Sequence, residues 1–198
     1  MKKIRSIALA AALVAGLLTQ AGCSKIPIAE PALEGPYGKE LGGDTRRASI
    51  YQGLETRLFV HIVWLKPELI AAQAALVSEM RAEPPDLAAV RLKKMQDDNA
   101  TPTFFAIAYT PTPSWNDWDS KNSVWRIAMD GPQGQVAPAK ITRYDGPFNA
   151  EMLQLYPYLD EFVSAYRIEF PQSAMGTDPK ILLAGVLGKV ELDWSKPE

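Results

Sequence analysis

The chain has 198 residues, with 21 lysines and arginines against 23 aspartates and glutamates and a formal net charge of −2. This length suits one domain with a short extension, and the lack of a basic run excludes the electrostatic footprint of a nucleic-acid-binding protein. The single cysteine, Cys23, excludes a disulfide framework and a cysteine-based metal site.

Residues 1–22 have the three-part layout of an export signal. The basic start "MKKIR" is followed by a run without charge from Ile7 to Leu18 and then by "TQAG", which ends in small residues. A membrane-spanning helix needs about 20 apolar residues, so this run is too short to cross a bilayer. The sequence therefore predicts a signal peptide that is removed.

The residues around Cys23 resemble a bacterial lipoprotein signal, in which small residues precede a cysteine that receives lipid on its sulfur and becomes the N-terminus after cleavage. Ala21 and Gly22 fit this pattern, whereas Gln20 stands where the family usually has Leu or another apolar residue. The resemblance implies that Cys23 is the lipid attachment site. Two alternatives are cleavage by an ordinary signal peptidase after "TQA" and a free thiol packed in a helix.

The same resemblance implies a location. Ser24 is similar to the residue that permits transport to the outer membrane, so we expect a cell-envelope protein, lipid-anchored in the outer membrane and facing the periplasm. Loss of Lys2, Lys3 and Arg5 with the leader leaves 18 basic and 23 acidic residues, a net charge of −5. Because no polybasic patch is present, membrane attachment would come from the N-terminal lipid.

Residues 23–44 are rich in proline and glycine and show no helical or alternating apolar period. We expect a flexible, semi-extended tether here, followed by a single β-rich domain over residues 45–198. Its segment "RLFVHIVWL", residues 57–65, is apolar on both faces and predicts a central buried strand.

A helical pair is expected to interrupt the strands at residues 67–98. The segment that begins at Pro67 is rich in alanine and strong helix formers, and "EPP" separates it from a second helical stretch. Apart from the leader and one turn near residues 152–158, we expect no other helix.

Strand patterns fill the remainder, at residues 103–110, 124–131, 135–144, 163–170 and 181–194. Tyr166, Ile168 and Phe170 alternate with charged residues and should face inward, and Gly185 and Gly188 are typical of a bulge or a close backbone approach. The predicted fold class is mainly β: an antiparallel β-sandwich or partly open barrel with an inserted α-helical pair. This is similar in outline to the small outer-membrane lipoprotein of type VI secretion systems, an analogy of architecture without a shared motif.

Catalytic patterns are scarce. His61, the only histidine, lies mid-strand among apolar neighbours, where a hydrogen-bonded structural role is favoured over a catalytic triad. One histidine and one cysteine argue against zinc, and no phosphate-binding glycine motif occurs. We therefore expect no catalytic residue, metal or cofactor.

The most distinctive local feature is the loop that contains Trp115, Asp117, Trp118 and Asp119, which are the candidate binding residues. Indole rings beside carboxylates suit a protein or sugar ligand, although the two tryptophans could instead cap an open end of the sandwich.

The sequence thus favours a non-enzymatic binding or assembly role with an envelope protein as partner. The alternative is a carbohydrate-binding module or a carboxylate-dependent glycan-active enzyme that uses the Trp115–Asp119 loop. The adjacent carboxylates Asp160 and Glu161 form a second candidate pair for that chemistry.

Overall fold

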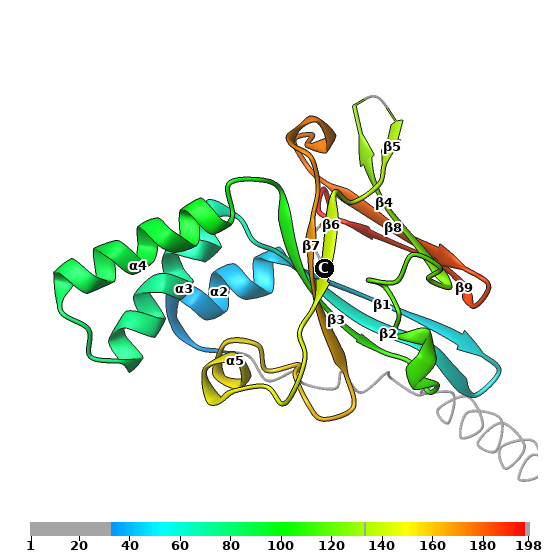
Figure 1. The fold of residues 1–198 in the computed structure, drawn as a ribbon, viewed down its shortest axis with the longest axis horizontal. Helices are drawn as coiled ribbons and strands as arrows, with labels where there is room; N and C mark the ends of the chain where they lie inside the picture. The colour runs from blue at the N-terminus through cyan, green and yellow to red at the C-terminus, as the bar shows by residue number, and fades with distance from the viewer. Residues whose placement is uncertain (1–32, 133, 197–198) are drawn as a thin grey trace, which may run out of the picture. The chain divides into compact units, whose positions relative to one another are not determined.

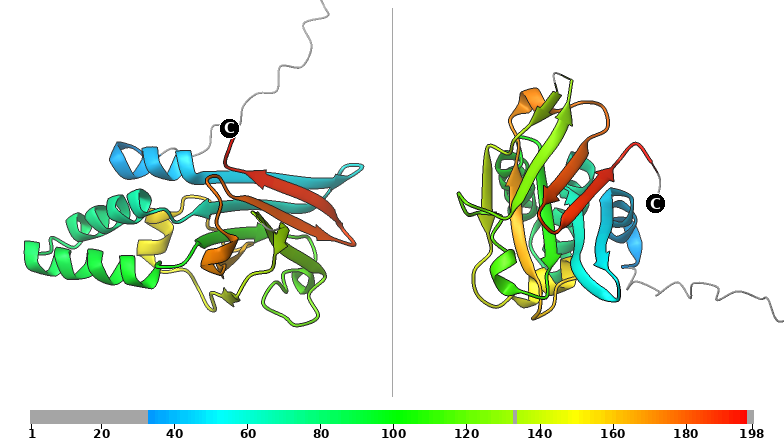
Figure 2. Two further views of the ribbon diagram at one scale, coloured as in Figure 1. Left: turned by 90° about the horizontal axis from the view of Figure 1, so that it is seen from above. Right: turned by 90° about the vertical axis from the view of Figure 1, so that its right-hand side faces the viewer.

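A computed structural model describes residues 33–132 and 134–196, which form two antiparallel sheets and a helical layer (Figures 1 and 2). The five-stranded sheet has the order β1 (Thr45–Gln52), β2 (Glu55–Trp64), β3 (Thr103–Tyr109), β7 (Ser164–Glu169) and β6 (Lys140–Arg143). The four-stranded sheet has the order β5 (Gly134–Val136), β4 (Trp125–Gly131), β8 (Lys180–Gly185) and β9 (Gly188–Asp193). The predicted mainly-β, antiparallel fold class is confirmed.

The main core lies between the two sheets. Alternate residues of β2, Leu58, Val60 and Ile62, point into it and have no exposed surface. Tyr166 and Ile168 of β7 join them, as the alternating pattern predicted. The inner face of the five-stranded sheet is therefore defined by a period of two along each strand.

A second core lies on the outer face of the same sheet, beneath α2 (Gly35–Asp44), α3 (Pro67–Met80) and α5 (Ala150–Leu155). Val63 and Leu65, at the end of β2 and just beyond it, pack there against Leu69 of α3. Because β2 is buried on both faces and lies between β1 and β3, the prediction of a central strand is confirmed.

The helical insertion consists of α3 and α4 (Pro85–Asp98), as predicted for residues 67–98. Helix α4 packs on α3, and none of its residues is fully buried. Glu83, between the two helices, accepts hydrogen bonds from Arg91 Nε at 2.8 Å and Ser78 Oγ at 3.0 Å. These interactions lower the pKa of Glu83 to about 2.

Helix α2 corrects the prediction of a tether for residues 35–44 and of helix confined to 67–98. The expected signal peptide and the first part of the expected tether, up to residue 32, lie outside the described residues. The helix belongs to the compact unit that begins at residue 31. Tyr37 and Leu41, one turn apart, are buried in the outer core, and the Tyr37 hydroxyl donates a hydrogen bond to the Leu155 carbonyl at 2.8 Å. Tyr37 and Leu41 are the only apolar side chains of the helix that are buried, and the four glycines around them leave no clear helical period of apolar residues in the sequence.

Two predicted strands are each divided. Residues 135–144 form β5 and β6, which belong to different sheets, because Pro138 between them has no N–H to donate to a ladder. Residues 181–194 form the hairpin of β8 and β9, whose turn lies between Gly185 and Gly188.

The sheets meet along β1 and β9. Arg46 Nε of β1 donates to the Asp193 carbonyl at 3.0 Å, and Trp194 Nε1 donates to the Asp44 carbonyl at 2.8 Å. Nearby, the buried carboxylate of Asp44 lies 2.5 Å from Lys66 Nζ. Burial raises the pKa of Asp44, although Lys66 opposes this effect. The fold is thus a sandwich joined along one edge.

Candidate functional site

The Trp115–Asp119 loop does not present its aromatic rings as the sequence suggested. Trp118 is only 3% exposed and stacks on Tyr166 inside the main core, with ring centroids 4.9 Å apart and planes 15° apart. Its ring is therefore packed in the core and is not presented by an exposed loop. Trp115, in the short helix η1 (Pro113–Trp115), is half-buried, and the Arg57 guanidinium lies 5.8 Å from its ring centroid.

The carboxylates of this loop have different surroundings. Asp117 accepts hydrogen bonds from Ser123 Oγ at 2.9 Å and from the Val124 backbone N–H at 3.0 Å, so it holds the loop against β4. Asp119 is exposed. The Trp115 carbonyl accepts from Trp125 Nε1 at 2.9 Å, and Trp125 is buried. This loop closes one end of the sandwich, which is the structural alternative that the sequence left open.

The better candidate is a pocket on the outer face of the five-stranded sheet, here named the sheet-face pocket, with a volume of about 430 Å³. It lies beside the first half of β2, whereas α2, α3 and α5 cover the sheet beside the last residues of that strand (Figure 1). Six aromatic residues line it: Tyr51, Phe59, His61, Tyr109, Tyr158 and Phe162. Its size is within the range of small-molecule sites.

A β-bulge shapes this pocket. Ile50 pairs with Leu58, but the next residue, Tyr51, pairs with Thr56, so Arg57 has no partner in the register. Arg57 instead reaches Trp115. The bulge brings Tyr51 and Thr56 into the pocket lining, in agreement with the way bulges redirect side chains near binding sites.

His61 lies at the base of this pocket and is 4% exposed. Its ring stacks on Tyr158, with centroids 4.2 Å apart and planes 10° apart. Phe59 meets the same ring edge-on at 4.8 Å and 78°. His61 is therefore on the outer face of its strand, where the ring of Tyr158 covers it.

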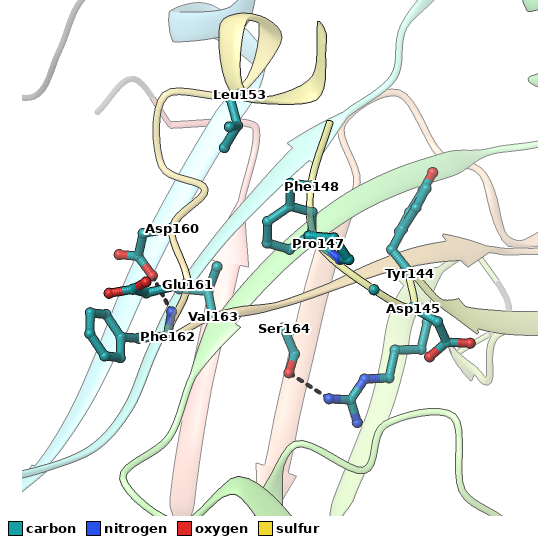
Figure 3. A pocket seen from close by; sticks show the side chains of 12 residues that line it. Tyr144, Asp145, Pro147, Phe148, Leu153, Asp160, Glu161, Phe162, Val163 and Ser164 are labelled. Atoms are coloured by element: carbon teal, nitrogen blue, oxygen red, sulfur yellow. Dashed lines mark hydrogen bonds between the residues drawn. The ribbon is translucent and has the colours of Figure 1, made fainter. Parts of the chain in front are cut away.

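A second pocket adjoins the first and is here named the loop pocket, with a volume of about 620 Å³ (Figure 3). Asp160, Phe162 and Val163 line both pockets. Figure 3 shows Asp160 and Glu161 together at the left of the view, beside Phe162, with Tyr144 and Asp145 of the lining segment 143–148 on the opposite side.

Acidic side chains dominate the charge of the two pockets. Asp145, Asp160 and Glu161 are exposed, and none forms an ion pair within residues 33–132 and 134–196. Among the described residues that line either pocket, the only lysine or arginine is Arg143, whose Nη1 donates to the Asn116 carbonyl at 3.0 Å and whose Nη2 donates to Ser164 Oγ at 3.1 Å. These two hydrogen bonds attach the guanidinium to the fold.

The rim of the pockets is unusually apolar for an exposed surface. Phe162 and Tyr51, which belong to the pocket linings, are 68% and 60% exposed. We call the two pockets and this rim the groove. Large exposed apolar side chains beside a pocket are typical of interaction surfaces.

Sequence reasoning could identify only part of the groove. The pair Asp160–Glu161 was visible as adjacent carboxylates, but the lining comes from the β1–β2 hairpin, β3, the segment before β7 and the end of β6. Segments so far apart in the chain share no local motif.

Several other features constrain the site. Within the described residues no cluster of three or more His, Cys, Asp or Glu side chains is arranged to hold a metal ion. No helix in this part of the chain is long and apolar enough to cross a membrane. Cys23 lies outside the described residues. Comparison with protein-family models, curated proteins and solved structures found no match.

Proposed function

We propose that the protein is a lipid-anchored component of the bacterial cell envelope that binds a partner without chemical turnover. The observation that carries this proposal is the leader of residues 1–22, which directly precedes Cys23, the only cysteine of the chain. Lipid on Cys23 would hold the domain at the membrane, and Ser24 supports placement in the outer membrane, facing the periplasm. Several acyl chains on one terminus give a stable anchor, whereas a single chain binds only marginally.

The groove is the binding surface in this proposal. Its rim exposes Tyr51 and Phe162, and burial of such side chains releases roughly 25 cal/mol for each Å² of apolar area. Aromatic anchors of this kind dominate the energetics of most interfaces. An envelope protein or a glycan could supply the partner surface.

The glycan-active alternative loses its first support, because Trp118 is packed in the core. Its second support, the pair Asp160–Glu161, lies on one wall of the loop pocket (Figure 3). Hydrolysis of a glycosidic bond needs two carboxyl groups that flank the bond, about 5–10 Å apart. A binding role needs no such arrangement, so we favour it.

Two experiments test the two halves of the proposal. The full-length chain and a Cys23→Ala variant are expressed in a Gram-negative host and the membranes are fractionated. We expect the wild type in the outer-membrane fraction and the variant in the soluble periplasmic fraction. Equal distribution of the two proteins would contradict the lipid anchor.

The groove is tested by photocrosslinking in the same cells. A benzoylphenylalanine side chain is placed at Phe162 or, as a matched control, at Val90 on α4, which is 65% exposed. We expect a discrete crosslinked product from position 162 and none from position 90. Identical patterns from both positions would contradict the groove as the binding surface.

A further inference from the structure

The lining of the sheet-face pocket indicates the chemistry of its ligand. Six of the ten described residues that line it carry aromatic rings, and among these ten the only acidic or basic side chain other than His61 is Asp160. We propose that this pocket binds a substituted organic ammonium ion, such as a trimethylammonium group. The inference rests on the groove being the binding surface, as proposed above, and does not depend on the lipid anchor.

The arrangement of the rings supports a cation. Phe59 is nearly perpendicular to His61, and Tyr158 is stacked parallel to His61. Because these rings have different orientations, a compact ligand in the pocket can contact more than one aromatic ring. Aromatic faces attract ammonium groups through the ring quadrupole, and methylated ammonium ions also gain from apolar contact. Ile107 and Val163 supply that apolar contact.

Asp160 supplies the counter-charge. Its Oδ1 accepts a hydrogen bond from the Phe162 backbone N–H at 2.7 Å, which orients the carboxylate at the boundary of the two pockets. No lysine or arginine occurs among the described residues that line the sheet-face pocket. The loop pocket adds Asp145 and Glu161, so the charge of the groove is complementary to a cation.

Other ligand classes fit less well. An anionic group would face several carboxylates, and a phosphate attached to the ammonium would meet Asp160 and Glu161 at the mouth of the pocket. A neutral sugar usually takes several oriented polar groups, whereas apolar and aromatic side chains make up most of this lining. The free ammonium group is therefore the favoured ligand.

The test compares choline with its neutral isostere, 3,3-dimethylbutan-1-ol, by calorimetry on the purified mature protein in a detergent without ammonium groups. These probes have the same shape and differ in charge. We expect choline to bind about tenfold more tightly, because cation–π and carboxylate attraction act only on the cation. Equal affinities, or no binding of choline up to about 100 mM, would overturn the proposal.

Three variants locate the site. Asp160→Asn keeps an oxygen that can accept from the Phe162 N–H but removes the charge, and should weaken choline binding about fivefold or more. Tyr158→Leu keeps apolar volume but removes a ring, and should weaken it about tenfold. Asp130→Asn changes an exposed carboxylate of β4, outside the lining of both pockets, and should have no effect. Unfolding curves verify that each variant is folded.

The remaining outcomes are distinguishable from failure of the proposed function. If a neutral oligosaccharide binds at this pocket and choline does not, the ammonium assignment is wrong, although the groove remains a binding surface. Binding of a lysine-rich peptide without binding of choline would likewise overturn it in favour of a protein partner. Loss of the crosslink at Phe162 with choline binding retained would instead contradict the proposed macromolecular partner.

Discussion

Replacement of Trp118 by alanine tests whether the Trp115–Asp119 loop is part of the core. Removal of a buried tryptophan costs about 3–5 kcal/mol of the free energy of unfolding, and this side chain is 3% exposed and stacked on Tyr166. Its Nε1 has no hydrogen-bond partner among the described residues, so removing this N–H returns about 1 kcal/mol. We therefore expect a net loss of about 2–4 kcal/mol.

Urea unfolding followed by far-UV circular dichroism measures this loss directly. Thermal unfolding provides a second measurement, and for a domain of this size we expect Tm to fall by about 5–15 °C. The matched control is Trp115→Ala in the same loop, where the ring is only half-buried and its cation contact with Arg57 contributes about 1 kcal/mol or less. If both variants lose less than about 1 kcal/mol, the loop does not close the core and our reasoning is refuted.

Three further predictions concern charge and backbone. Glu83→Gln should make the stability of the protein less sensitive to acid. Because the pKa of Glu83 is lowered to about 2, the stabilisation by its carboxylate is present above the ordinary pKa of 4.5 and is lost as the pH falls towards 2. Urea unfolding at several pH values measures this effect, and parallel curves of stability against pH for variant and wild type would contradict it. Asp44→Asn should raise the free energy of unfolding at pH 7. Burial raises the pKa of this carboxyl, so its ionisation at neutral pH destabilises the native state. A variant less stable than the wild type would show that the ion pair with Lys66 outweighs the cost of desolvation. Gly188→Ala should cost about 1–3 kcal/mol, because φ is +139° and a Cβ would lie 2.9 Å from Ile50 Cγ2, whereas Gly42→Ala, in open space on a helix, should be neutral or stabilising.

Periodicity made much of the fold predictable. The strand at residues 57–65 is apolar on both faces because it is buried on both faces, and the helical pair at 67–98 changes from a period of two to a helical one at Pro67. These elements can be recognised from local sequence patterns, without knowledge of the surfaces against which they pack.

The sequence could not predict elements that depend on distant contacts. Helix α2 is anchored by Tyr37, whose hydroxyl reaches Leu155 more than a hundred residues away. In strand β1, "TRRASIYQ", the more exposed alternate side chains are mainly polar and the less exposed ones include an arginine, so the sequence shows no clear alternation of apolar residues. Trp118 looked exposed because the ring that covers it, Tyr166, belongs to a strand much later in the chain.

The groove was hidden for the same reason. Phe162 was visible only as an apolar residue beside Asp160 and Glu161, and its exposure follows from the course of the segment between α5 and β7. The bulge at Tyr51 and Thr56, which brings their side chains into the pocket, depends on strand pairing. Neither the exposure of Phe162 nor the bulge can be inferred from the local sequence.

Mass spectrometry of the native N-terminal peptide, from protein isolated from a Gram-negative host, tests the central proposal most directly. The lipid anchor requires that the mature chain begins at Cys23 and that its sulfur carries diacylglycerol. We expect the mass of that thioether on a peptide that starts with Cys23 and Ser24. A mature chain that begins at another residue and contains a free Cys23 thiol would contradict it.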